Sequence, residues 1–193
     1  HRHSSAASDV YKRQQYYNAL NMKEIYVLRH AKSSWDNSNL SDFERPLADR
    51  GISDAKKMSK FLKDMDLKID KVFCSNAIRA KETFDLTADG FNFEIDKATY
   101  TDKLYFGDTT NIIKDLKELD ESIKNILIVG HNPTLYHLVE LLTYKSIDRF
   151  TTCNLAIISH DGEWISLNSQ QCRLKSLTKP KELRNWKRLK SKY

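Results

Sequence analysis

The sequence of 193 residues is poor in cysteine and has no long apolar segment. Its three cysteines, Cys74, Cys153 and Cys172, are far apart, odd in number and form no CxxC pair, which disfavours both a disulfide framework and a zinc site. Such cysteines suit a reducing compartment, so we expect a cytoplasmic protein. No apolar run approaches the ~20 residues that a membrane-spanning helix needs, and we expect no membrane partner.

Residues 1–21 are polar and lack the apolar stretch of a secretory signal. Part of this segment resembles translated sequencing-adapter sequence, and Met22 directly precedes an apolar strand pattern. We therefore expect 1–21 to be a non-native or disordered leader. The rest of a chain that is 40% hydrophobic suits one domain over 22–170, followed by a basic tail over 171–193.

The net charge of +6 is distributed unevenly along the chain. From Arg173 to Tyr193 there are nine Lys or Arg and one Glu, a net charge of +8, and residues 1–21 carry +2, which leaves 22–172 at −4. The basic tail could bind nucleic acid or an acidic partner. Because no nucleic-acid motif accompanies it, we interpret it as a solvated end and expect no nucleic-acid partner.

Short apolar runs alternate with amphipathic ones through the rest of the chain. Strands are expected over 23–29, 71–74, 91–95 and 125–129, with a hairpin formed by 155–159 and 164–167 around an Asp-Gly turn. Helices are expected over 51–65, from a Ser75 cap through Leu86, over 109–119, from an Asn132 cap through Leu142, and from Pro180. The alternation predicts an α/β fold, a three-layer sandwich with a mostly parallel central sheet and helices on both faces.

Two histidines stand at the carboxyl ends of predicted strands. Arg29 and His30 follow one apolar run, and His131 follows another. Ligands of open parallel sheets bind at this edge, arginine grips an oxyanion with a bidentate fork, and a neutral imidazole can attack phosphorus. The alternatives are a solvated arginine beside a hydrogen-bonded histidine, and a capping turn that contains His131 by chance.

Arg79 lies in the first turn of the helix that follows the strand 71–74. A helix N-terminus favours an anion and disfavours a cation, so this arginine is interpreted as serving a ligand. The alternative is a surface arginine paired with Glu82 or Asp85. Two histidines and two arginines, each beyond a buried strand, together favour one shared anionic site.

Four segments carry a resemblance to a known family. LRHAKSSW (28–35), RPLADRG (45–51), SNAIRAKET (75–83) and VGHNPTL (129–135) resemble, in order, the motifs of the histidine phosphatase superfamily, and specifically of its small SixA-like phosphohistidine phosphatase branch. The resemblance spans residues 23 to about 143. It departs at Asn76, where the family usually has Pro, which changes the helix start but removes no chemical group.

The resemblance implies roles for the matching residues. His30 would be the nucleophile that forms a phosphohistidine intermediate. Arg29 and Arg79 would hold the phosphoryl oxygens, and His131 would hydrogen-bond them and stabilise the transition state. Lys32 and Ser33, in the loop directly after His30, would add donors to the phosphate.

The proton donor is less well defined by the sequence. In larger members of the superfamily, an acidic residue protonates the leaving group. By position, its counterpart in this sequence lies near 100–105, which makes Asp102 the candidate. Its alternative is a solvated turn residue. Asp36 and Asp42, in the loop after His30, are weaker candidates. A phosphorylated imidazole is a better leaving group than an alcohol, so its hydrolysis does not require a strong acid.

The sequence thus predicts a metal-independent phosphatase without a cofactor, acting through a phosphohistidine enzyme intermediate. Cationic arginines beside His30 would repel a divalent ion. The resemblance to the small branch implies a site without a covering cap, which suits a phosphohistidine in a phosphorylated protein. The alternatives are a broad phosphatase for small phosphorylated metabolites and a non-catalytic module that recognises phosphate.

Overall fold

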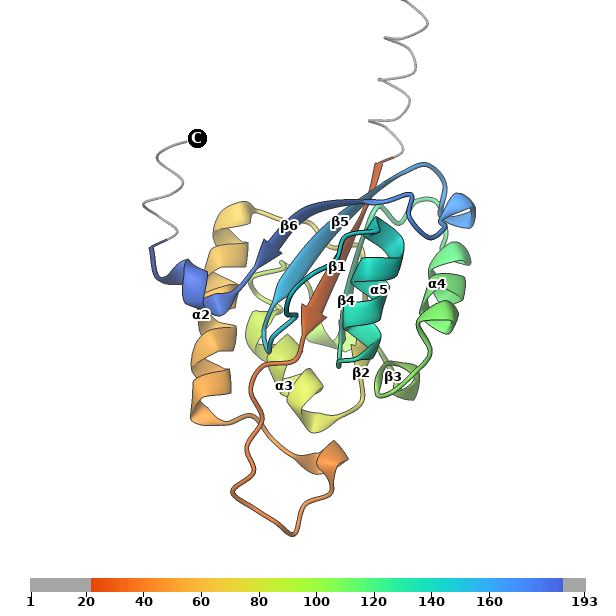
Figure 1. Ribbon diagram of the computed structural model, residues 1–193. Coiled ribbons are helices and arrows are strands. Elements are labelled where there is room, and N and C mark those ends of the chain that lie inside the picture. Colours follow the sequence, from red (N-terminus) through yellow and green to blue (C-terminus); the bar gives the residue numbers. More distant parts are fainter. Residues whose placement is uncertain (1–21, 186–193) are drawn as a thin grey trace, which may run out of the picture.

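A six-stranded sheet forms the centre of the computed structural model, which describes residues 22–185 (Figure 1). The strands, in the spatial order β3-β2-β4-β1-β5-β6, are β1 (Met22–Arg29), β2 (Lys71–Ser75), β3 (Thr99–Thr101), β4 (Asn125–Gly130), β5 (Leu155–Asp161) and β6 (Arg173–Thr178). The first four in this order are mutually parallel, and β5 and β6 are each antiparallel to the preceding strand. The predicted mostly parallel sheet is confirmed.

Helices cover both faces of the sheet, as predicted (Figure 1). One face carries α2 (Asp49–Met65) and α3 (Ile78–Thr87), and the other carries α4 (Thr109–Lys117) and α5 (Thr134–Thr143). Side chains that alternate along β1 join opposite cores: Tyr26 and Leu28 pack with α2 and α3, whereas Ile25 and Val27 pack with α4 and α5. Burial on both faces explains why this strand is apolar throughout.

Short 3₁₀ helices complete the described part of the chain: η1 (Asp42–Glu44), η2 (Ile95–Lys97), η3 (Asp102–Leu104), η4 (Trp164–Ser166) and η5 (Pro180–Asn185). None of the helices in residues 22–185 is long and apolar enough to cross a membrane.

One edge of the sheet collects many connections. The parallel strands β1, β2 and β4 end there. Antiparallel β5 begins at the same edge, because Leu155 pairs with Leu28, and β6 ends there, because Thr178 pairs with Leu155. We call this side of the molecule the carboxyl edge.

The strand expected over 91–95 is wrong. Asn92 has a left-handed φ of 52°, and the Phe93 amide donates to the Ala88 carbonyl, so this run is the turn that ends α3. The apolar residues there serve packing rather than a strand, with Phe91 fully buried against the core. The edge strand forms a few residues later, at Thr99–Thr101.

The expected hairpin partner 164–167 is also wrong. Trp164 is fully buried, its indole N–H donates to the Ile123 carbonyl at 2.8 Å, and its backbone N–H donates to Glu121 at 2.7 Å. These contacts hold η4 as a turn, and β6 pairs with β5 instead. The sheet therefore extends past residue 170 into the segment expected to be a tail.

The sequence predicts a leader over 1–21 and a basic helix from Pro180 at the other end of the chain. Residues 1–21 and 186–193 lie outside the described residues. Within the described part, Pro180–Asn185 forms a 3₁₀ helix, and Leu183 is buried in the core beside α2.

The start of α5 differs from the prediction in detail. The helix begins at Thr134, after a cis peptide bond between Asn132 and Pro133. Asn132 does not cap it, because its amide Nδ2 donates to the Phe150 carbonyl at 2.8 Å. Asn132 therefore ties the end of β4 to the loop before β5.

Candidate active site

His30 and His131 meet at the carboxyl edge, one directly after β1 and the other directly after β4. Their ring centroids are 4.8 Å apart. The two strands are neighbours, and the His30 amide extends their ladder by donating to the Gly130 carbonyl at 3.0 Å. The parallel pairing of β1 with β4 thus fixes the spacing of the two imidazoles.

His30 is arranged as a neutral base with one unprotonated nitrogen. Its Nδ1 lies 2.7 Å from the Ala31 carbonyl oxygen, which can only accept, so Nδ1 carries the proton. Burial, together with the charges of Arg79, Arg29 and Arg45, lowers the pKa of His30 from 6.5 to about 3. The residue is 7% exposed. Nε2 therefore keeps its lone pair at neutral pH.

Arg79 lies against this nitrogen. Its Nε is 3.4 Å from His30 Nε2, and the residue is only 4% exposed. Its outer nitrogens bind Asp42: Nη2 lies 2.9 Å from the carboxylate, and Nη1 donates to the backbone carbonyl. The alternative, a surface arginine paired with Glu82 or Asp85, is wrong, because Arg79 is buried and its side chain contacts His30 and Asp42.

Thr83, which sequence reasoning did not single out, links the segments that carry His30 and Arg79. Its hydroxyl accepts from the Ala31 amide at 2.9 Å and donates to the Arg79 carbonyl at 2.5 Å. Thr83 is fully buried, one helical turn after Arg79. The residue therefore joins the backbone after His30 to the helix that carries Arg79.

His131 is held by Ser75, which the sequence suggested only as a helix cap. Nε2 of His131 lies 2.8 Å from Ser75 Oγ, and Nδ1 is buried with no partner in the described structure. Burial lowers the pKa of His131 to about 2, with the nearby His30 and Arg79 acting in the same direction. A buried ring nitrogen without a partner is costly, unless a ligand group satisfies it.

Arg29 is half-buried beside these groups. Its Nη1 donates to the Phe150 carbonyl at 2.8 Å, and its Nε is buried without a partner in the described residues. Burial, and then the charge of Arg79, lower the pKa of Arg29. Arg29 and Asn132 share the same carbonyl, so the loop before β5 positions both.

Lys32 and Ser33, the two loop residues predicted to bind phosphate, lie in different surroundings. Lys32 is exposed, and the described structure shows no side-chain bond that directs it to the histidines. Ser33 is buried and accepts from Arg45 Nη2 at 2.5 Å. Arg45, 7% exposed and stacked 3.4 Å from the Trp35 ring, is a cation near the site that the RPLADRG segment contains but that sequence reasoning did not select.

The three acidic candidates lie in different surroundings. Asp102 is exposed, and its carboxylate accepts from Asn76 at 2.9 Å. Asp36 accepts from Ser34 at 2.6 Å. Of the three, Asp42 is the one that contacts Arg79.

Asp42 binds Arg79 as described above and accepts from the Tyr105 hydroxyl at 2.6 Å. Partial burial raises its pKa, but hydrogen bonds from Tyr105 and Arg79 outweigh it and hold the pKa of Asp42 below its usual value. The carboxylate is therefore ionised in the resting site.

Aromatic rings border His131 on the solvent side. Tyr105 stands edge-on to the His131 ring at 5.2 Å between centroids, and Phe106 lies 6.5 Å away while 64% exposed. Phe43 packs against Tyr105 at 4.9 Å. These rings form a wall beside the histidines, whereas Trp35 covers Arg45.

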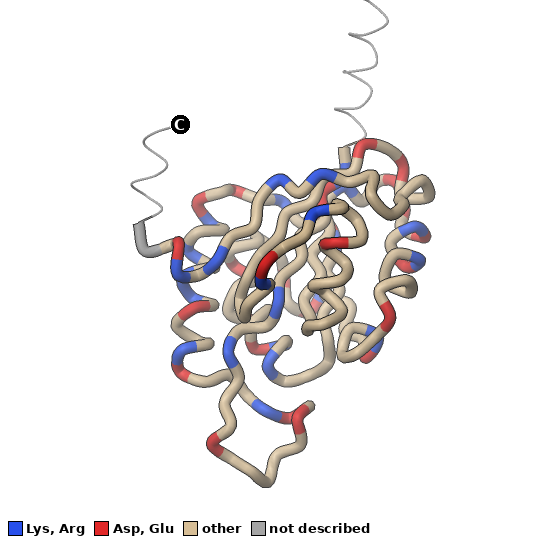
Figure 2. Tube along the Cα trace, viewed as in Figure 1, with Lys and Arg blue, Asp and Glu red and all other residues tan. Residues whose placement is uncertain are grey.

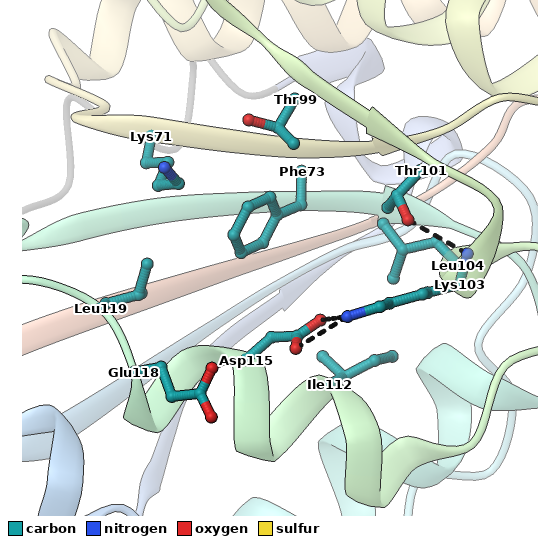
Figure 3. Close-up of a pocket in the computed structure, with 10 residues that line it drawn as sticks. All are labelled: Lys71, Phe73, Thr99, Thr101, Lys103, Leu104, Ile112, Asp115, Glu118 and Leu119. Carbon is teal, nitrogen blue, oxygen red and sulfur yellow. Dashed lines mark hydrogen bonds and ion pairs between the residues drawn. The ribbon is translucent and has the colours of Figure 1, made fainter.

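A separate hollow of about 350 Å³ lies between β2, β3 and α4 (Figure 3). Phe73 and Ile112 point into it, and Lys103 closes one end by pairing with Asp115 at 2.9 Å. None of the residues around His30 and His131 lines this hollow. The chemistry-bearing groups therefore lie elsewhere, at the carboxyl edge.

The residues do not form an evident metal centre. Across residues 22–185, no group of three or more His, Cys, Asp or Glu side chains is placed to hold a metal ion. What the cluster does offer is a neutral imidazole nitrogen beside buried guanidinium groups, an arrangement that fits an oxyanion.

Comparison with known proteins agrees with this geometry. Residues 25–119 match the histidine phosphatase superfamily (branch 1). An uncharacterized protein of Mycobacterium leprae is 31% identical over 166 residues, which cover 80% of this chain and all of the relative. The phosphohistidine phosphatase SixA of Escherichia coli K12 is 26% identical over 140 residues, 72% of this chain and 86% of SixA.

Comparison with solved structures also shows similarity to SixA. The protein histidine phosphatase SixA complexed with tungstate superposes with a TM-score of 0.74 at 26% identity, covering 83% of this chain and 99% of SixA. This chain therefore belongs to the histidine phosphatase superfamily, and its similarity to SixA supports phosphatase activity.

Proposed function

We propose that this protein is a phosphohistidine phosphatase, which removes the phosphoryl group from a histidine of a phosphorylated protein without a metal ion or cofactor. The buried contact between His30 Nε2 and Arg79 Nε carries the proposal. An unprotonated ring nitrogen beside a guanidinium can attack a phosphoryl group that the guanidinium holds. Arg29 and His131, with a buried nitrogen each left unpaired, would supply further donors to its oxygens.

The reaction has two displacements. First, the lone pair of His30 Nε2 bonds to phosphorus while the P–N bond of the substrate breaks, and the departing imidazole takes up a proton. Nδ1 keeps its proton, which it donates in a hydrogen bond to the Ala31 carbonyl, so the ring phosphorylated at Nε2 is an imidazolium. Water then attacks phosphorus, the bond to Nε2 breaks, and inorganic phosphate leaves.

Access to the site supports a protein substrate. Between Asp102 and His131 the chain forms only η3, α4 and β4, with no inserted domain over the histidines. A small metabolite gains affinity from enclosure, whereas a side chain on a protein surface needs an open approach. SixA, the relative named a protein histidine phosphatase, was solved with tungstate, an oxyanion, which supports an anion site here as well.

Asp42 is our candidate for the proton donor, in place of Asp102. It is ionised at rest, but a phosphoryl group bound to Arg79 brings further negative charge close to its carboxylate. Like charge raises a carboxyl pKa, so substrate binding favours the protonated form. Asp102, bonded to Asn76, has no such contact in the described structure.

The decisive experiment compares substrates and variants. We expect the wild type to hydrolyse a histidine-phosphorylated peptide faster than glucose 6-phosphate, through an acid-labile phosphoenzyme. The phosphoenzyme should be absent in His30→Ala and present in His137→Ala, a matched change of an exposed histidine. Preference for the sugar phosphate would favour the metabolite phosphatase. Tungstate binding without turnover of either substrate or of p-nitrophenyl phosphate would favour a recognition module.

A further inference from the structure

A second hollow, which is lined mainly by polar and charged residues, lies at the carboxyl edge, apart from the histidines. Its volume is about 460 Å³. Three segments line it: the first half of α2, the loop before β5, and the chain after β6. Its charged lining residues are Arg50, Asp54, Lys57, Arg149, Lys179 and Lys181.

The charges in this hollow, which we call the basic pocket, do not cancel. Asp54 is its acidic lining residue and is already shared by Arg50 at 3.6 Å and Lys57 at 3.0 Å. In the part of the chain that the structure describes, no carboxylate forms an ion pair with the remaining three cations, Arg149, Lys179 and Lys181. The pocket therefore has an uncompensated positive charge, and Figure 2 shows blue positions where η5 lies beside α2.

The basic pocket and the candidate active site share a loop. Arg149, Thr151 and Thr152 line the pocket, while the carbonyl of Phe150 between them accepts from Arg29 at 2.8 Å. The Cys153 amide, next in the chain, lies 3.1 Å from the Arg29 and His30 carbonyl oxygens. The loop that contacts Arg29 and the backbone of His30 therefore also lines the basic pocket.

We propose that the basic pocket binds an acidic segment of the protein substrate while its phosphohistidine occupies the active site. This inference rests on the proposed function and specifies its substrate class: phosphoproteins with Asp- or Glu-rich surface beside the phosphorylated histidine. Complementary charge brings such partners together and orients them. A small phosphorylated molecule carries no such segment, so the pocket would discriminate between protein substrates.

The test uses two histidine-phosphorylated peptides of equal length, one flanked by Asp and Glu and the other by Ser and Gly. The variant reverses the unpaired charges: Arg149→Glu, Lys179→Glu and Lys181→Glu together. A matched control reverses three exposed lysines outside the pocket lining: Lys60→Glu, Lys114→Glu and Lys145→Glu. We expect the pocket variant to raise KM for the acidic peptide at least about tenfold, with kcat and p-nitrophenyl phosphate hydrolysis unchanged.

The control should leave the preference for the acidic peptide intact. Equal KM changes in both variants, or equal changes for both peptides, would overturn the pocket assignment. Fluorescence anisotropy with the unphosphorylated acidic peptide tests binding without turnover, so a protein that fails to hydrolyse phosphohistidine still reports on the pocket. If the pocket variant instead loses affinity for a labelled single-stranded oligonucleotide and keeps affinity for the peptide, a nucleic-acid surface replaces this proposal.

Discussion

Arg79 and Asp42 form an ion pair across the candidate site, 2.9 Å from Nη2 to Oδ2, although 37 positions separate them in the sequence. Arg79 is 4% exposed and Asp42 is 42% exposed, so the carboxylate lies on the solvent side of a buried guanidinium. Under the proposed function, a phosphoryl group, which carries the same sign of charge as Asp42, would compete for the same donors. We therefore expect the carboxylate to set how strongly the resting site attracts anions.

Asp42→Asn should bind anions more tightly than the wild type. Removing the charge leaves Arg79 free to pair with an oxyanion, which is worth several-fold in affinity, or about 1 kcal/mol for a partly exposed pair. Inhibition by tungstate and by inorganic phosphate measures the effect. Unchanged inhibition constants would show that Asp42 and the oxyanion do not share Arg79.

The two acid candidates can be separated by leaving-group dependence. If Asp42 protonates the leaving group, Asp42→Asn should lower kcat on phenyl phosphate about 10²-fold and affect p-nitrophenyl phosphate far less, because nitrophenolate departs without a proton. Asp102→Asn is the matched variant and should behave as the wild type on both. The reverse pattern would restore Asp102 as the donor.

The two site histidines should stay neutral across the physiological range. Their lowered pKa values, about 3 for His30 and about 2 for His131, place protonation well below the usual 6.5. Near pH 6.5 these histidines take up protons only in the unfolded chain. Their contribution to the free energy of unfolding is therefore constant above pH 6.5, and it lowers that free energy progressively as the pH falls below 6.5. Histidine NMR from pH 5 to 8 checks this, and a titration midpoint near 6.5 for either ring would contradict it.

Thr83→Val should damage both stability and activity. The change leaves the buried Ala31 amide without its acceptor, which costs about 1–3 kcal/mol, and loosens the carbonyl that holds His30 Nδ1. Thr87→Val is the control, because the Thr87 hydroxyl donates only to helix carbonyls of Thr83 and Phe84. Urea unfolding and kcat measure the two effects. Equal losses in both variants would show that Thr83 is a packing residue only.

Sequence patterns located the strand ends well and the connections less well. Apolar runs 25–28 and 126–129 form buried strands, because continuous apolar character is what a strand covered on both faces requires. The run 91–95 alternates apolar Phe91, Phe93 and Ile95 with polar residues, yet a left-handed Asn92 turns it back onto α3. A short apolar run does not by itself distinguish a strand from a turn that packs.

The sequence by itself determined which residue types stand at the ends of the buried strands: Arg29 with His30, and His131. These positions follow from local hydrophobic patterns, which do not depend on distant contacts. Only the tertiary structure decided that Asp42 rather than Asp102 contacts Arg79, and that Thr83 and Ser75 support the histidines. It also decided that basic residues of three separate segments line one pocket. Such partners are joined by sheet order and loop paths, which no local pattern contains.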